Sequence, residues 1–317
     1  MIDAALDLAG DDLKIIGLFG GEPLLPKNRP ALEYIISKAP DKEYIITTNG
    51  YYLEEFLDVL TKVNVMNIAV TLDGEEATHD SRRYLANGKP TYGKIMSGIM
   101  KCLENSIHTT IRMNLDKSNF VECNGLKERL LEEYARYGGL LNFDVSPMLE
   151  TASPEKNEMF LELYNFDIGC NPEERKQRNR LLSSFSPIVN TLLSNKKLMP
   201  KYAFCYAHDN GYWVDPYGNI YPCILTVGME ELAIGKYYPN VEFYENSIRN
   251  RNIDKIPECR ECKYSLLCGG GCPLPLIDYS DVFKPVCHAI KNEIHNLLPM
   301  LYAAEKKVKA YDTTTHE

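Results

Sequence analysis

Cysteine has the clearest chemical pattern of any residue type in this sequence. Seven of the ten cysteines lie between residues 205 and 287, and four of them form one run: Cys259-x2-Cys262-x5-Cys268-x3-Cys272. A Cys-x2-Cys pair lets two thiolates bind one metal ion or one face of a cluster from a single turn, while wider gaps bring ligands from neighbouring loops. The three glycines 269–271 separate the last two cysteines, where backbone N–H groups can approach cluster sulfur. The spacing therefore indicates a metal or iron-sulfur site.

Zinc is the simplest alternative, because four-cysteine zinc sites use the same paired spacing. Seven cysteines do not divide into closed tetrahedral sites, since one set of four leaves three. A cubane with three protein ligands and one open iron is chemically reasonable, whereas a structural zinc site is closed. His208 or Asp209 would complete a second zinc site. At this point both metals remain open, with clusters favoured.

The composition limits the compartment and the partners. A chain of 317 residues with 44% hydrophobic content can bury one large core or two ordinary ones, so we expect two lobes. The formal net charge of -9 argues against a nucleic-acid partner. No apolar run approaches the roughly 20 residues of a membrane span, and the segment 1–12 is acidic where a secretory signal would be basic. We therefore expect a cytoplasmic protein with no membrane contact, in which cysteines serve metals and not disulfides.

The elements that must position these residues follow from hydrophobic periodicity. Short apolar runs rich in β-branched residues predict five strands: Leu13–Phe19, Tyr44–Thr48, Met66–Leu72, Ile107–Asn114 and Leu140–Val145. Amphipathic stretches between them predict helices: Arg29–Lys38, Leu53–Val63, Tyr92–Asn105 and Asn124–Tyr137. Repeated βα order predicts an α/β fold with a parallel sheet and helices outside it.

Unusual residues follow the predicted strands, at the edge where such sheets carry their sites. They are Gly20-Gly21-Glu22-Pro23, Asn49-Gly50, Asp73-Gly74 and Asn114. A glycine after a strand is usually a turn former, so each motif alone is a weak signal. Their shared edge makes them a candidate site.

We predict four segments along the chain. Residues 1–150 form the α/β domain, 151–200 a helical connection, 201–290 the cysteine-rich domain, and 291–317 a helix and tail. Within the connection, Pro172 opens a predicted helix that runs to about Asn195.

The cysteine-rich segment resembles a known family. The motifs that carry this resemblance are Cys205-x12-Gly218-x4-Cys223, Cys259-x2-Cys262-x5-Cys268-x3-Cys272 and Cys287. Together they are similar to the seven-cysteine signature of the SPASM domain of radical S-adenosylmethionine (SAM) enzymes.

The first half of the chain is similar to the barrel of the same family. The matching segments are Gly20-Gly21-Glu22-Pro23, Thr48-Asn49-Gly50, Thr71-Leu72-Asp73-Gly74 and His79-Asp80-x2-Arg83. They look like the family's GGEP, TNG, SLDG and HDxxR motifs. The resemblance covers the chain from about Leu13 to Cys287.

The resemblance implies cofactors and ligands. Gly20, Gly21 and Glu22 would hold the amino group of SAM, and a carboxylate and exposed carbonyls suit an ammonium. Thr71 and Asn114 would contact other parts of SAM. Two auxiliary [4Fe-4S] clusters are implied: cluster I would be held by Cys205, Cys223 and Cys272, and cluster II by Cys259, Cys262, Cys268 and Cys287. Some relatives add a cysteine just upstream of Cys205, and its absence here implies an open iron in cluster I.

The sequence departs from the family in one motif. Relatives carry Cys-x3-Cys-x2-Cys after the first barrel strand, and these thiolates bind the cluster that cleaves SAM. No such spacing occurs in this sequence. We therefore expect a partial (β/α)6 barrel without its first strand, a third cluster only in a full-length form, and no SAM cleavage by this polypeptide. A shortened gene and a degenerate paralogue are the two explanations. Cys102, Cys123 and Cys170 are not expected to replace the lost ligands.

Relatives of this kind abstract hydrogen from a peptide or protein with a 5′-deoxyadenosyl radical. The resemblance thus implies a peptide maturase, served by a flavodoxin- or ferredoxin-type electron donor. Sulfatase maturation is an alternative, although Ile224 stands where those relatives place a proton-accepting Asp, and an isoleucine cannot act as a base. A noncatalytic iron-sulfur protein that binds a peptide or passes electrons is the other alternative.

Overall fold

The structure is a computed structural model. It describes residues 1–116, 118–147, 188, 191, 197–205, 207, 212–276, 282–287, 290–291, 293–299 and 302. These divide into two units. One unit holds residues 11–147, and the other holds residues 1–10 together with the described residues from 188 onward.

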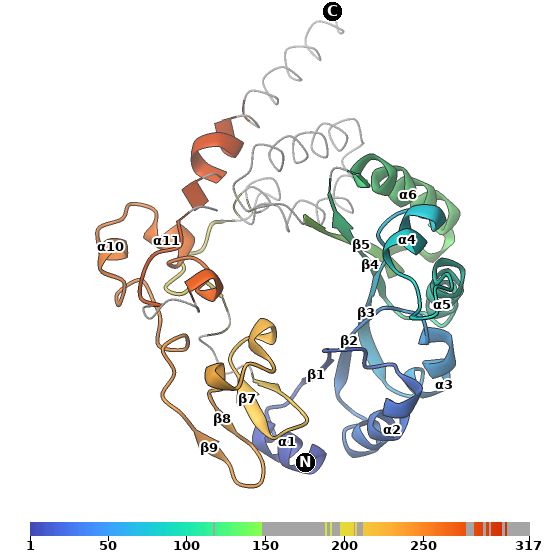
Figure 1. Cartoon of the computed structure of the whole chain (residues 1–317), viewed down its shortest axis with the longest axis horizontal. Helices are drawn as coiled ribbons and strands as arrows, with labels where there is room; N and C mark the ends of the chain where they lie inside the picture. The colour runs from blue at the N-terminus through green and yellow to red at the C-terminus, as the bar shows by residue number, and fades with distance from the viewer. Residues whose placement is uncertain are drawn as a thin grey trace, which may run out of the picture. The chain divides into compact units, whose positions relative to one another are not determined.

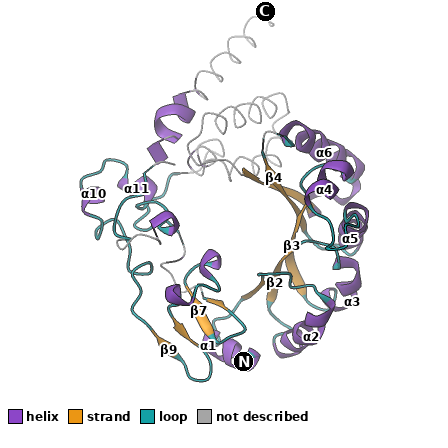
Figure 2. Cartoon of the chain, in the orientation of Figure 1, coloured by secondary structure: helices purple, strands orange, loops and turns teal. Residues whose placement is uncertain are grey.

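The first unit is built on a five-stranded parallel sheet in the order β1-β2-β3-β4-β5. Its strands are β1 Ile15–Leu18, β2 Glu43–Thr48, β3 Asn64–Thr71, β4 Thr109–Leu115 and β5 Leu141–Pro147. All five predicted strands are confirmed. Figures 1 and 2 show the helices of this unit along one side of the sheet. This arrangement confirms the predicted α/β fold class.

The helices of this unit connect consecutive strands. They are α2 Arg29–Lys38, α3 Leu57–Leu60, α4 Glu76–Arg82, α5 Tyr92–Glu104 and α6 Phe120–Glu133, with short 3-10 helices at Pro26–Asn28, Leu53–Phe56 and Ala135–Leu140. The sequence predicted a single helix over 53–63, where the chain instead makes a 3-10 turn before α3. It did not predict α4.

The core of the first unit lies between the sheet and these helices. Side chains alternate between buried and partly exposed along β2 and β4, as expected when successive residues point to opposite faces of a sheet. Ile46, Ile68 and Ile111 are fully buried, and Ile95 and Ile99 of α5 are buried as well. This packing fixes the strand ends that carry the predicted SAM motifs.

The second unit has a smaller core. Its antiparallel sheet has the order β6-β7-β8-β9, with strands Trp213–Val214, Asn219–Tyr221, Gly235–Lys236 and Glu242–Phe243. Short 3-10 helices lie at Ile224–Thr226, Glu230–Leu232 and Leu274–Leu276, followed along the chain by a π-helical turn at Glu293–Leu297. Two helical turns, α10 Pro257–Arg260 and α11 Ser265–Cys268, lie within the cysteine run.

Helix α1, Ile2–Ala9, belongs to this second unit. Residues 1–10 were predicted to belong to the α/β domain. They belong to the second unit because Ala4, Ala5 and Leu8 pack against the buried cluster of Ile220, Ile234 and Tyr237. The other domain boundaries remain predictions. The predicted helix 172–195 lies outside the described residues except for Ile188 and Thr191, which are helical.

Candidate functional site

Glu22 joins the ends of the first two strands of the parallel sheet. Its Oε1 accepts hydrogen bonds from the backbone N–H of Leu24 (3.0 Å) and from Thr48 Oγ1 (2.5 Å). Its Oε2 accepts from the backbone N–H of Asn49 (2.6 Å). The carboxylate therefore holds the GGEP loop against the end of β2. Gly20 and Gly21 are exposed in the same loop.

A second polar network lies at the ends of β3 and β4. Asp73 is 4% exposed, and its Oδ1 accepts hydrogen bonds from the backbone N–H and side-chain amide of Asn114, both at 3.0 Å. Its Oδ2 forms an ion pair with Arg83 at 2.6 Å. Thr71, the last residue of β3, is partly buried. Asn114 is thus held by Asp73.

His79 supports this network from α4. It is fully buried, its Nδ1 accepts from the backbone N–H of Asp73 (3.2 Å), and its Nε2 lies 3.2 Å from Thr91 Oγ1. Burial lowers the pKa of His79, and Arg83 acts in the same direction, whereas Asp73 and Asp80 oppose the shift. Nδ1 must carry no proton to accept its bond, so neutral His79 fits this position.

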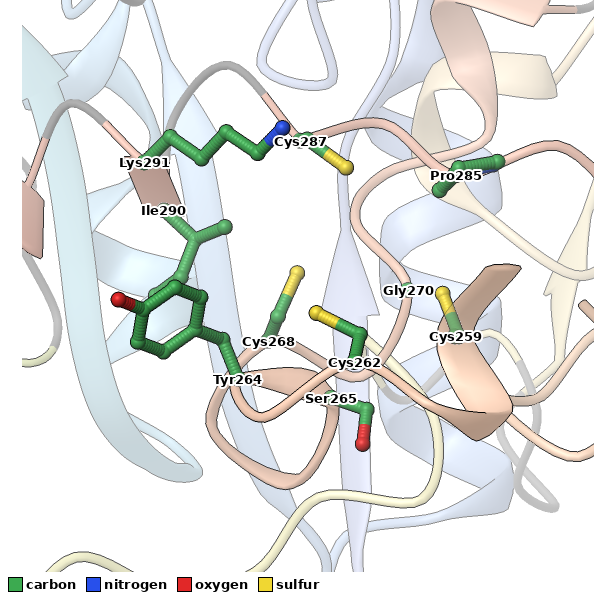
Figure 3. Close-up of a pocket in the computed structure, with 10 residues that line it drawn as sticks. All are labelled: Cys259, Cys262, Tyr264, Ser265, Cys268, Gly270, Pro285, Cys287, Ile290 and Lys291. Carbon is green, nitrogen blue, oxygen red and sulfur yellow. The ribbon is translucent and has the colours of Figure 1, made fainter.

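Four cysteines line one pocket in the second unit. The pocket is bordered by Cys259, Cys262, Cys268 and Cys287, together with Tyr264, Ser265, Gly270, Pro285, Ile290 and Lys291. Figure 3 shows the side chains of Cys262, Cys268 and Cys287 turned toward the same space. These four cysteines are the set that the family resemblance implied for cluster II, although Cys287 is separated from the others by a long stretch of sequence.

The thiols of this pocket interact electrostatically. Burial raises the pKa of Cys259 to about 11, and the neighbouring Cys268, Cys287 and Cys262 add to the shift. Burial also raises the pKa of Cys268, while the backbone N–H groups of Gly270 and Gly271 act against the shift. Proximity of several thiolates disfavours ionisation without a cation, which a bound metal centre would supply.

The remaining three predicted ligands form a second group. Burial raises the pKa of Cys272, and the thiols of Cys205 and Cys223 add to the shift, while the N–H of Leu274 opposes it. Cys205 is exposed, and Cys223 and Cys272 are half-buried. The structure thus brings Cys205 and Cys223 within electrostatic range of Cys272.

The glycine segment 269–271 lies between Cys268 of one group and Cys272 of the other, and it is closely packed. A Cβ on Gly269 would lie 2.5 Å from the backbone of Ala203, two residues before Cys205. A Cβ on Gly271 would lie 2.1 Å from the carbonyl oxygen of Val286, next to Cys287. Both glycines have positive φ values, 67° and 76°. Only glycine allows this approach, which holds the cysteine-bearing segments together.

This chain is similar in sequence to known proteins. Residues 1–117 match the radical SAM superfamily. The chain contains a radical SAM domain. A cysteine-type anaerobic sulfatase-maturating enzyme of Clostridium novyi is 24% identical over 247 residues, which are 72% of this chain and 63% of that protein.

Two solved structures share the fold of the radical SAM domain and of the unit that follows it. The structure of anSMEcpe with bound AdoMet and Kp18Cys peptide has a TM-score of 0.61 at 16% identity, covering 96% of this chain and 89% of its own. The structure of Streptococcus suis SuiB bound to precursor peptide SuiA has a TM-score of 0.61 at 15% identity, covering 89% of this chain and 67% of its own.

The two cysteines of the first unit are buried thiols, and neither was expected to replace the lost cluster ligands. Cys102 and Cys123 are 0% and 1% exposed, and burial raises the pKa of each to about 12. Cys170, His208 and Asp209 lie outside the described residues. Among the residues described, no group of three or more His, Cys, Asp or Glu side chains is arranged to hold a single metal ion. The helices described include none that is long and apolar enough to cross a membrane.

Arg251 is fully buried beside the glycine segment, and the sequence did not predict this. An arginine in a polar stretch carries no pattern signal, because its burial depends on loops that are distant in sequence. The role of Glu22 in joining two strand ends could not be predicted for the same reason.

Proposed function

We propose that the second unit holds two auxiliary [4Fe-4S] clusters and that the function of this chain is that of a radical SAM enzyme that modifies a peptide or protein. The observation that supports this best is the pocket lined by Cys259, Cys262, Cys268 and Cys287. Cysteine thiolates in sets of four are the usual ligands of such clusters. In the proposal this set holds one cluster, and Cys205, Cys223 and Cys272 hold the other with one open iron.

The radical SAM domain binds SAM at its strand ends in this proposal. Gly20 and Gly21 present exposed backbone at the loop that Glu22 holds in place, where carbonyl groups suit an ammonium. Thr71 and Asn114 contact other parts of the ligand. SAM, once cleaved at an iron-sulfur cluster, supplies a 5′-deoxyadenosyl radical, and the protein orients the peptide and excludes water. A flavodoxin- or ferredoxin-type protein supplies electrons.

Metal analysis tests the cluster part of the proposal. Protein purified without oxygen is expected to contain about seven to eight irons and matching sulfide, as two cubanes require. Cys262→Ser is expected to lose about half of this iron, because it removes one ligand of one cluster. Cys102→Ser is the matched control and keeps all the iron, since Cys102 is buried in the radical SAM domain. Zinc in place of iron, or full iron in the Cys262 variant, contradicts the proposal.

The peptide part is tested with the product of the whole reading frame that encodes this chain. We expect 5′-deoxyadenosine to form in step with a change in the mass of a cysteine-containing peptide substrate. Formation of 5′-deoxyadenosine with no peptide altered, across candidate peptides from neighbouring genes, would count against a maturase.

Sulfatase maturation is the second candidate, favoured by the Clostridium novyi relative. Ile224, the residue after Cys223, opposes it because an aliphatic side chain accepts no proton. We therefore expect no oxidation of the cysteine in a sulfatase-derived peptide. Conversion of that peptide would make sulfatase maturation the correct function.

A further inference from the structure

Arg251 is the largest of the fully buried side chains in the part of the molecule that is described, at 0% exposure. Its guanidinium donates four hydrogen bonds, all to backbone carbonyls. They join Nη2 to Gly270 O (2.6 Å), Nη1 to Gly271 O (2.6 Å), Nε to Val282 O (2.7 Å) and Nη2 to Lys284 O (2.8 Å). The side chain thus links the glycine segment to residues 282–284, which precede Cys287 in the sequence.

A buried guanidinium needs compensation for its lost hydration. Carbonyl dipoles supply part of it, and no carboxylate among the described residues forms an ion pair with Arg251. Burial lowers the pKa of Arg251, and the opposing influence comes from thiolates. They belong to both cysteine groups: Cys259, Cys268, Cys272 and Cys205. The carbonyls of Gly270 and Gly271 that accept from Arg251 lie between Cys268 and Cys272 along the chain, so cluster-bound thiolates would supply the negative charge near this cation.

We propose that Arg251 is a positioning residue that raises the reduction potentials of both auxiliary clusters, acting through its positive charge and through the peptide bond between Gly270 and Gly271. This inference rests on the proposed function, since it requires clusters at the two cysteine groups. It concerns a residue that does not itself contact iron.

The peptide bond supplies a direct route from the guanidinium to a cluster ligand. The carbonyl of Gly270 accepts from Arg251 Nη2. The N–H of the same peptide group, on Gly271, acts on the thiol of Cys268 and lowers its pKa. The guanidinium at this carbonyl polarises the peptide group, and so strengthens the interaction between its N–H and the sulfur. Hydrogen bonds to sulfur and added positive charge both stabilise the reduced, more negative cluster.

The geometry also explains why the residue is arginine. The four carbonyls come from two segments, 270–271 and 282–284, and the planar fork of the guanidinium presents donors to all of them at once. A lysine keeps the charge but has one nitrogen, so it separates the effect of charge from the effect of the fork.

The test is a redox titration of the full chain, monitored by electron paramagnetic resonance, with iron and sulfide measured on every sample. Arg251→Gln removes the charge, and Arg251→Lys retains it. Arg249→Gln is the matched control, because it removes the same charge two residues away, from a side chain that stacks on Tyr212. In Arg251→Gln we expect at least a tenfold lower equilibrium constant for reduction, about 59 mV for one electron. The cluster held by Cys268 should shift most.

Each outcome decides the inference. A shift in Arg251→Gln, with Arg251→Lys and Arg249→Gln near the wild-type potential, supports it. Unchanged potentials in an Arg251→Gln protein with full iron overturn it. If Arg251→Gln loses its iron, Arg251→Lys decides. A reduction potential near that of the wild type in the lysine variant supports the role of charge. A tenfold drop in its equilibrium constant for reduction, or loss of its iron as well, overturns the proposal and leaves Arg251 a packing role. Wild-type protein without clusters would instead refute the proposed function.

Discussion

Replacement of Glu22 by glutamine tests whether this side chain is the joint between the GGEP loop and the end of β2. The amide oxygen can take the place of Oε1 and still accept from Leu24 and Thr48. The new NH2 group then faces the backbone N–H of Asn49, which now donates to Oε2 at 2.6 Å. The variant therefore loses one hydrogen bond to a charged acceptor and sets two donors against each other.

The loss of one such bond corresponds to about 1.5–3 kcal/mol. Because Glu22 is only half-buried, we take about 2 kcal/mol, which lowers the melting temperature of a unit of this size by about 4–8 °C. The assay is thermal unfolding followed by far-ultraviolet circular dichroism. Glu104→Gln is the control, since Glu104 is exposed at the end of α5 and its replacement should change stability by less than about 0.5 kcal/mol.

A Glu22→Gln protein that melts within 1 °C of wild type would refute this reasoning, with ~1 °C taken as the error of such a measurement. Glu22 would then serve only to bind a ligand. An equal loss in Glu104→Gln would show that the effect comes from net charge and not from the three hydrogen bonds.

Three further outcomes follow from burial and close packing. Lowering the pH below 6.5, the ordinary pKa of histidine, should destabilise the radical SAM domain, because the unfolded chain binds a proton that buried His79 binds only at lower pH. Chemical denaturation at pH 7 and at pH 5 measures this loss of stability, which should be smaller in His79→Gln. Gly271→Ala should lose about half of the iron, since its Cβ meets the carbonyl of Val286 at 2.1 Å, and normal iron content would contradict that clash. Iodoacetamide at pH 8 should leave Cys102 and Cys123 unmodified in the folded protein, because burial raises the pKa of each thiol to about 12. Both should be labelled in the denatured protein, and peptide mass spectrometry measures the difference.

The sheet could be predicted because its strands are short apolar runs whose period of two survives in the burial pattern of β2 and β4. Helix α2 was predicted to the residue, since its apolar positions repeat with helical spacing. Helix α4 was missed because Glu76–Arg82 is polar along its length, and only His79 is buried against the rest of the unit.

The cysteine sites were also predictable from the sequence only in part. The spacing of the run from Cys259 to Cys272 indicated a site, but the contribution of Cys287 and the division into two groups came from a family resemblance. Arg251 had no such signal, because its four acceptors lie about 20 to 30 residues away along the chain. Long-range packing of one polar side chain is not encoded in any local period.

Helix α1 has a consequence for biosynthesis. Its apolar face consists of Ala4, Ala5 and Leu8. The side chains that cover it, Ile220, Ile234 and Tyr237, are synthesised more than two hundred residues later. Until then this short amphipathic segment has no partner within its own unit, so the nascent chain must keep it from aggregating while the parallel sheet folds. The cysteine-bearing unit can close only after Cys287 has been synthesised, so iron and sulfide are expected to reach it after the whole parallel sheet has been made.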